Sequence, residues 1–279
     1  MITQGTKLVA SLTHNRHSTT KLNRRSAVEA FAGIGRLRTR AATIGSSIAL
    51  LLVLNLMIST SAQASPDGDR RPSPTSCSAG YVGLTYDDGP SDWTRGVSKT
   101  LKANKLRATF FMMGSKVEQN PRMVRKVVDD GHIVGNHTFT HPRLTDLAAA
   151  DVKKEIVRTS SAIKKVTGSN PKLFRPPYGL TNEQIREAAA SAGMTEVIWT
   201  IDTYDYMGYT AQQIVDAVAT AKDGDVILMH DDSDIDITAI PLFAKVLSDK
   251  NLCAGKIVPS QDPVHAWDGL DYYAKVVPF

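Results

Sequence analysis

The sequence predicts a single α/β domain, a (β/α) barrel of seven or eight units that is closed or partly open. From Tyr81 onward, short apolar segments alternate with helical patterns, which is typical of a mostly parallel sheet with crossover helices. About 215 residues follow an N-terminal leader, enough for one domain with a substantial core. So many units in one domain favour a barrel over an open doubly wound sheet.

The expected strands are short and apolar. They are residues 81–86, 108–112, 132–134, 173–174, 196–201 and 225–229, with a further one at 256–258. Helical patterns lie between them. They cover 152–166 before a stop at Gly168, 181–192 after capping-box spacing at 181–184, 212–221, and 240–247 after Pro241.

The leader, residues 1–64, has the features of a secretory signal peptide. It carries eight basic residues and one acid, then an apolar run from Ile44 to Ile58, then the small-x-small sequence Ala62–Ala64. The run is shorter than the roughly twenty residues that a spanning helix needs. We therefore expect a secreted, extracellular protein, with an uncleaved membrane anchor as the alternative.

The net charge of the chain without its leader argues against nucleic-acid binding. Without the eight basic residues and one acid of the leader, 25 of the 33 basic residues and 27 of the 28 acids remain, so the mature chain is near −2. The alkaline pI therefore belongs to the leader. No basic stripe remains, and we expect no nucleic-acid partner.

Residues 65–79 read as a flexible, Pro-containing linker, 80–258 as the α/β domain, and 259–279 as a tail that either packs or contacts a partner. Cys77 and Cys253 are the two cysteines. In an oxidising compartment they are expected to form one disulfide, with two buried free thiols as the alternative. Neither possibility makes them catalytic.

Polar residues gather where the expected strands end, which is where a (β/α) barrel carries its reactive groups. They are Asp87 and Asp88 after the first strand, His137 and His141 after the third, Arg175 after the fourth, Asp202 and Asp205 after 196–201, and His230 after 225–229.

Two of these groups predict a metal site. The spacing of His137 and His141 lets both imidazoles reach one ion, and one carboxylate from Asp87–Asp88 would complete the three-ligand shell of a catalytic zinc site. A cation also accounts for two adjacent carboxylates that otherwise repel each other. No cysteine is placed to contribute, so the ligands would be nitrogen and oxygen.

Five segments carry a family resemblance: Thr85–Pro90, His137–His141, Arg175–Tyr178, Asp202–Tyr206 and Leu228–His230. In this order they resemble the motifs of the NodB-type polysaccharide deacetylases, the fourth family of carbohydrate esterases. The match runs from about Gly80 to Val258 and is closest to the secreted acetylxylan esterase and chitooligosaccharide deacetylase branch. It implies the distorted (β/α) barrel of that family.

The resemblance also implies roles for residues in the first three of these five segments. Asp88, His137 and His141 would hold a divalent metal, Zn²⁺ first and Co²⁺ as the alternative. Asp87 would be the general base that deprotonates the attacking water. Arg175 would pair with Asp87 and fix its position and charge.

The remaining roles concern the transition state and the leaving group. The backbone N–H of Tyr178 would complete an oxyanion hole, and Leu228 would line the pocket for the acetyl methyl group. His230 would be the general acid, and Asp205 behind it would keep the imidazolium charged. Pro176, in the motif of Tyr178, is assigned with it to substrate binding.

One departure from the family pattern concerns Tyr206, where most relatives have Trp, so the wall behind His230 must pack or hydrogen-bond differently. Trp93 and the stretch Met207–Tyr209 could offer aromatic surface to a sugar ring or simply cover loop bases. The acidic run Asp231–Asp236 is expected to be a solvated loop.

The sequence thus favours a monomeric, secreted, metal-dependent deacetylase of acetylated polysaccharide or oligosaccharide. N-acetylglucosamine chains are the first expectation, and O-acetylated xylan is the alternative. Two other classes remain: a carbohydrate-binding protein that has lost catalysis, and a hydrolase of small amides on the same scaffold.

Overall fold

The computed structural model describes residues 76–266, 269 and 271–279, and every element given below lies in one compact unit. The expected signal peptide, 1–64, and residues 65–75 of the expected linker lie outside the described residues. Among the described helices, none has the length and apolar character needed to cross a membrane.

The main sheet is parallel throughout and confirms the predicted fold class. Its order is β5-β4-β3-β2-β1-β7-β6, and β8 pairs with the beginning of β1. Since β5 and β6 do not pair, the sheet forms a half-barrel. The strands are β1 (Gly80–Gly89), β2 (Thr109–Met112), β3 (Ile133–Asn136), β4 (Leu173–Phe174), β5 (Thr195–Glu196), β6 (Ile201–Asp202), β7 (Val226–His230) and β8 (Leu252–Ala254).

The opening of the half-barrel corrects one predicted element, because the strand expected at 196–201 is two short strands at opposite edges of the sheet. Residues 197–200 connect the two strands. The Val197 N–H donates to the carbonyl oxygen of Phe174 in β4, and the Thr200 N–H donates to the carbonyl oxygen of Val226 in β7. The carbonyls of Val197 and Ile198 accept from the Arg175 side chain instead of a strand. The Arg175 side chain thus supplies the hydrogen bonds that a neighbouring strand would otherwise give to these two carbonyls.

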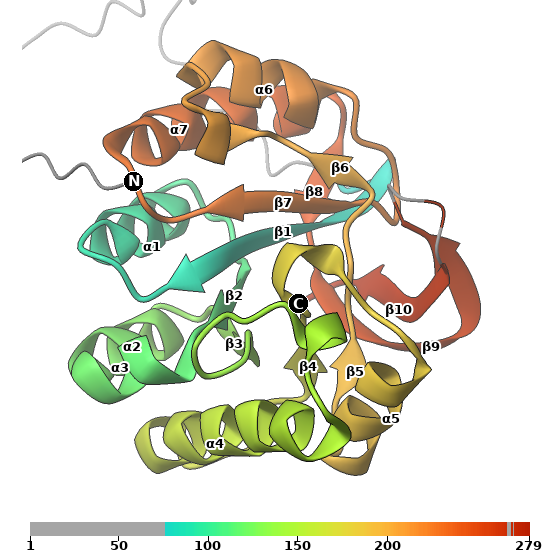
Figure 1. Cartoon of the computed structure of the whole chain (residues 1–279). Coiled ribbons are helices and arrows are strands. Elements are labelled where there is room, and N and C mark those ends of the chain that lie inside the picture. Colours follow the sequence, from blue (N-terminus) through green and yellow to red (C-terminus); the bar gives the residue numbers. More distant parts are fainter. Residues whose placement is uncertain (1–75, 267–268, 270) are drawn as a thin grey trace, which may run out of the picture. The chain divides into compact units, whose positions relative to one another are not determined.

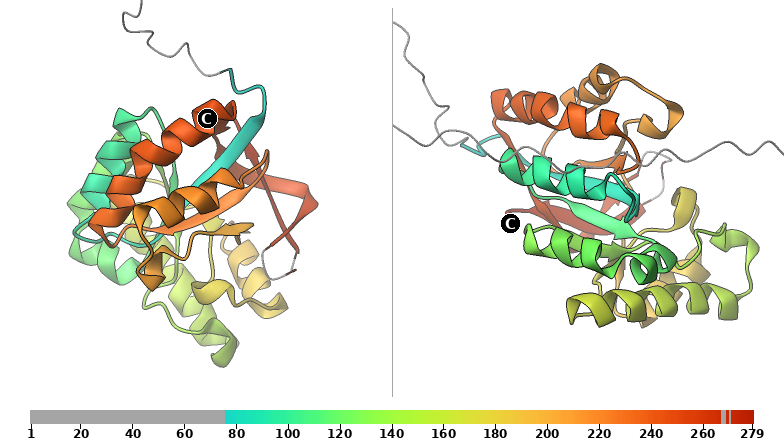
Figure 2. Two further views of the ribbon diagram at one scale, coloured as in Figure 1. Left: turned by 90° about the horizontal axis from the view of Figure 1, so that it is seen from above. Right: turned by 90° about the vertical axis from the view of Figure 1, so that its left-hand side faces the viewer.

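Helices cover the outer face of the sheet in the same order as the strands beneath them, α6-α7-α1-α3-α4-α5 (Figure 2). The largest apolar cluster lies between these helices and the sheet. The helices are α1 (Thr94–Ala103), α2 (Gly114–Gln119), α3 (Pro121–Asp129), α4 (Ala149–Thr167), α5 (Glu183–Ser191), α6 (Ala211–Ala219) and α7 (Asp234–Asp249).

Two helix starts differ from the prediction. Helix α7 begins at Asp234 rather than near Pro241, because Ser233 and Asp236 form a capping box there, and Pro241 lies inside the helix. Helix α5 is capped by Asn182, whose side chain accepts from Ile185 N–H. Thr181, the residue expected to cap it, donates to Glu196 instead.

The C-terminal segment is part of the domain. Strands β9 (Lys256–His265) and β10 (Asp271–Val277) form an antiparallel hairpin on the side opposite the arrowheads of β1 and β7 (Figure 1). Tyr272 and Ala274 are buried in a cluster with Leu173 and Trp199. The structure therefore supports the packed-tail alternative, and the boundary expected at 258/259 falls inside β9.

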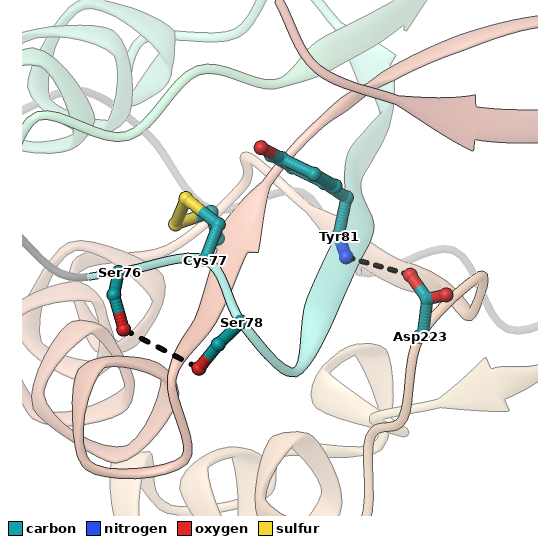
Figure 3. Close-up of a disulfide and its surroundings, with 6 residues drawn as sticks. Ser76, Cys77, Ser78, Tyr81 and Asp223 are labelled. Carbon is teal, nitrogen blue, oxygen red and sulfur yellow. Dashed lines mark hydrogen bonds between the residues drawn. A yellow bond between two sulfur atoms is a disulfide. The ribbon is translucent and has the colours of Figure 1, made fainter.

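Cys77 and Cys253 form the expected disulfide, which ties the chain before β1 to β8 (Figure 3). Beside it, Tyr81 N–H donates to Asp223 Oδ1 at 2.7 Å. Gly80 has a φ of +108°, and a Cβ there would lie 2.1 Å from the same oxygen. The folded unit thus begins within the segment expected to be a flexible linker.

Candidate active site

The carboxyl ends of the strands bring the predicted site residues together. Asp87 on β1 lies beside His230 on β7 in the strand register. His137 directly follows β3 and Arg175 directly follows β4, and these strands pair at Asn136 and Phe174. Because parallel strands end at one edge, residues far apart in sequence share one rim.

Asp88, His137 and His141 form the cluster predicted to hold a metal. Asp88 Oδ1 lies 3.4 Å from His137 Nε2 and 3.3 Å from His141 Nε2, and the three ligand atoms lie within 4.8 Å of one another. His137 Nδ1 faces the carbonyl oxygen of Arg175 at 2.7 Å. With the proton on Nδ1, this hydrogen bond leaves Nε2 free as a ligand.

The donor set fits a divalent cation. Asp88 Oδ1 is buried and has no hydrogen-bond partner among the residues that the structure describes, a costly state unless a cation faces it. Burial, together with His137, lowers the pKa of His141, which favours the neutral imidazole that binds metals. Although burial opposes it, the pKa of Asp88 is lowered by His137 and His141. Two nitrogens and one carboxylate oxygen match zinc-type ligation.

Strained backbone is concentrated at the same rim. Five of the seven non-glycine residues with positive φ in the described chain lie here: Asp88, Thr138, His141, Tyr178 and Tyr204. Such conformations cost roughly 1–3 kcal/mol each and persist only where the surroundings enforce them. The loops that carry the ligands are therefore held in place by other contacts.

Glu155 and Asn136 supply those contacts, and the sequence analysis missed both. Glu155 on α4 accepts from the N–H groups of Phe139 and Thr140 at 2.7 and 2.8 Å. Asn136 accepts from Thr138 N–H and donates to α4 through Ile156 O. Asn136 adjoins His137 and could have been noticed, but nothing in sequence connects Glu155 to a loop 15 residues earlier.

We expect Glu155→Ala to lower stability by about 1.5–3 kcal/mol, because two loop N–H groups lose a charged acceptor. Loosening this support should also weaken Zn²⁺ binding about 10-fold or more. Glu187→Ala on α5 is the matched control, since that side chain is exposed. Urea unfolding and Zn²⁺ titration of both variants test this. Equal behaviour of the two would remove Glu155 from the support of the loop.

Arg175 is fully buried and faces Asp87. Its Nη1 donates to Asp87 Oδ1 and to Thr85 Oγ1, both at 2.8 Å. Burial lowers the pKa of Arg175 and Asp87 opposes that shift, but a guanidinium remains charged in proteins. The structure thus provides Asp87 with the predicted cationic partner.

His230 and Asp205 form the second predicted pair. His230 Nδ1 lies 2.8 Å from Asp205 Oδ1, and the His230 backbone N–H donates to Asp205 Oδ2 at 2.5 Å. Burial lowers the pKa of His230, but the hydrogen bond and charge of Asp205 outweigh it and raise the pKa to about 9. The Asp205 carboxylate thus favours the charged imidazolium, the form of histidine that can donate a proton.

The remaining predicted residues line the same rim. Tyr178 is exposed and its ring meets the His141 ring edge-on at 4.6 Å, whereas Pro176 and Leu228 are buried. The Tyr206 ring meets His230 edge-on at 5.3 Å, and its hydroxyl hydrogen-bonds to Asp202. Tyr206 thus packs against His230 through its ring and is held by Asp202 through its hydroxyl.

The acidic run does not form the solvated loop that was expected. Asp231 and Asp236 are buried, 1% and 3% exposed, and Asp236 caps α7. Asp231 accepts from Thr94 Oγ1, and burial raises its pKa to about 8. Only part of the run is therefore available to solvent or substrate.

Comparisons with known proteins identify the family of this chain. A family model described as polysaccharide deacetylase matches residues 76–197. A chitooligosaccharide deacetylase of Sinorhizobium fredii is 35% identical over 153 residues, 54% of this chain and 71% of that protein. The chain belongs to the polysaccharide deacetylase family. Its relatives indicate a hydrolase acting on acetyl groups.

Two further proteins are similar to this chain. A family 4 carbohydrate esterase from Streptomyces lividans, solved in complex with acetate, is 44% identical, with a TM-score of 0.64 over 71% of this chain and 97% of that one. A bifunctional xylanase/xylan deacetylase of Cellvibrio japonicus is 39% identical over 67% of this chain. The chain spans only 28% of the length of that protein.

Proposed function

We propose that this protein is a secreted, metal-dependent deacetylase that removes N-acetyl groups from oligosaccharides or polysaccharides containing N-acetylglucosamine. The observation that carries the proposal is one rim that holds two ion pairs. The Asp87–Arg175 pair lies beside the ligand cluster, and the Asp205–His230 pair lies at the end of the neighbouring strand β7. Amide hydrolysis needs a base for the attacking water and an acid for the leaving nitrogen, and the two pairs can supply them.

Each residue has a distinct task. Asp88, His137 and His141 would hold a divalent cation, Zn²⁺ in the first place. When bound, the cation supplies Lewis-acid chemistry, lowering the pKa of a coordinated water and polarising the acetyl carbonyl. Asp87, oriented by Arg175, accepts the proton of the attacking water.

His230 completes the reaction by donating a proton to the leaving nitrogen, and Asp205 stabilises the imidazolium until it does so. The backbone N–H of Tyr178 would face the developing oxyanion. Leu228, buried next to the rim, would limit the acyl pocket to a small group such as acetyl.

The Asp205–His230 pair favours amide over ester substrates. An amine leaves only after its nitrogen is protonated, so a strongly charged acid contributes most to C–N cleavage. Chitooligosaccharide and chitin deacetylases among the relatives support this preference, and the xylan deacetylase supports O-acetyl esters as the second candidate. A purely carbohydrate-binding role would leave both acid–base pairs without a task.

Acetate release tests the proposal. The full chain, loaded with Zn²⁺, is incubated with chitooligosaccharides and with acetylated xylan, and acetate is measured against the Asp87→Asn variant. Faster release from the chitooligosaccharides supports the proposal, and faster release from xylan would favour the ester alternative. No release from either substrate, with Zn²⁺ bound, would refute deacetylation.

The pH dependence provides a separate prediction. A His acid with a pKa raised to about 9 is active below that value, so kcat should fall as pH rises through it. The charge of a bound cation moves this limb to lower pH. Asp205→Asn removes the partner that raises the pKa, so the alkaline limb should move down by about one unit or more. Profiles of kcat against pH for both proteins measure the shift, and an unmoved limb would mean that His230 does not titrate there.

A further inference from the structure

Large exposed side chains gather beyond His230. In the described chain, three of the nine exposed large hydrophobic residues fall in one short stretch: Tyr204, 39% exposed, Tyr206, 53%, and Met207, 63%. The Tyr204 ring lies 6.2 Å from Tyr206 and 6.0 Å from Tyr209 between centroids. Together Tyr206, Tyr204 and Tyr209 form an aromatic strip that leads away from His230.

The backbone conformation around Tyr204 keeps the rings of this strip exposed. Tyr204 adopts a left-handed conformation with φ of 55°, which is unusual for a bulky aromatic residue. Its N–H donates to Asp202 Oδ1 at 2.8 Å, and the Tyr206 N–H donates to Asp205 Oδ1 at 2.9 Å. These hydrogen bonds fix the backbone that carries the exposed rings before any ligand binds.

Three points argue for a ligand. Exposed apolar clusters on a soluble domain usually mark binding surfaces. Tyrosine combines an apolar face with a hydroxyl, which suits the C–H faces and hydroxyl groups of a sugar ring. The strip is also continuous with the reacting position, because the Tyr206 ring touches His230.

We infer that Tyr204 and Tyr209 bind a second pyranose ring of the substrate chain, on the His230 side of the ring being deacetylated. This inference rests on the proposed function for its substrate class. The ligand is an uncharged hexose ring linked to the reacting unit. The consequence is a preference for oligomers over the single sugar.

Kinetics across chain length test the inference. In the wild type, kcat/KM on N-acetylglucosamine oligomers should rise with length. Tyr204→Asn removes the ring and keeps a residue that tolerates positive φ, and Tyr209→Ala removes its neighbour. Each should lower kcat/KM for the hexamer about 3- to 10-fold, mainly through KM, and leave the shortest substrate nearly unchanged. Tyr273→Ala on β10 is the control, because Tyr273 is 50% exposed in the C-terminal hairpin.

A binding measurement separates this inference from the proposed function. Chitohexaose is titrated calorimetrically into the full chain carrying Asp87→Asn, alone and combined with Tyr204→Asn, Tyr209→Ala or Tyr273→Ala. Weaker binding with the first two and unchanged binding with the third supports the strip even if no acetate is ever released. Unchanged hexamer affinity in the Tyr204 and Tyr209 variants, or a wild type indifferent to chain length, would overturn it.

Discussion

Replacing Asp87 by Asn is expected to lower kcat for deacetylation about 10²- to 10⁴-fold, the usual contribution of a general base. The amide keeps the shape of the side chain and the hydrogen bond from Arg175 but accepts no proton at neutral pH. The ligand cluster should persist, because Asp88 Oδ1 is the carboxylate oxygen closest to both imidazoles. Zn²⁺ content and acetate release, measured on the same preparation, separate the two effects.

Asp88→Ala is the matched comparison, since the two carboxylates are neighbours in sequence with different surroundings. Its oxygen lies 3.4 and 3.3 Å from the His137 and His141 nitrogens, so its removal should lose Zn²⁺ and activity together. Equal loss of Zn²⁺ in the Asp87 and Asp88 variants would mean that both carboxylates are ligands and that the base lies elsewhere.

The grouping of the site residues on one rim could be predicted from the sequence. Strand ends in a parallel sheet meet at one rim, so residues at strand ends could be grouped without coordinates. Asp87, His137, Arg175 and His230 all follow that rule. The alternation of short strands and helices predicted the (β/α) barrel, closed or partly open, and the structure shows the half-barrel form.

Other features depended on tertiary contacts that no local pattern encodes. The segment 196–201 reads as one strand. In the structure the Arg175 side chain donates hydrogen bonds to the carbonyls of Val197 and Ile198, and the segment forms two short strands at opposite sheet edges. The charge density of Asp231–Asp236 is typical of a solvated loop, but Ser233 and Asp236 form a capping box that begins helix α7 there. Glu155 supports the ligand loop from a helix whose exposed face looks ordinary in sequence.

The dual role of Arg175 leads to a large expected effect on stability. Arg175→Met would leave the Asp87 carboxylate, 3% exposed, without its cation, and the carbonyls of Val197 and Ile198 without donors. Breaking a buried pair in this way typically costs 3–5 kcal/mol. We therefore expect urea unfolding of the full chain to show a loss of about this size, with activity lost as well.

Two further variants decide between loss of charge pairing and loss of the hydrogen bonds to the carbonyls of Val197 and Ile198. Lys245→Met breaks an exposed pair with Asp249, 75% and 61% exposed, and should cost less than about 1 kcal/mol. Adding Asp87→Asn to Arg175→Met removes the stranded charge, so the double variant should be more stable than Arg175→Met alone. If it is no more stable, the loss comes from the unpaired carbonyls at 197–198, and Arg175 serves chiefly to close the gap between β5 and β6.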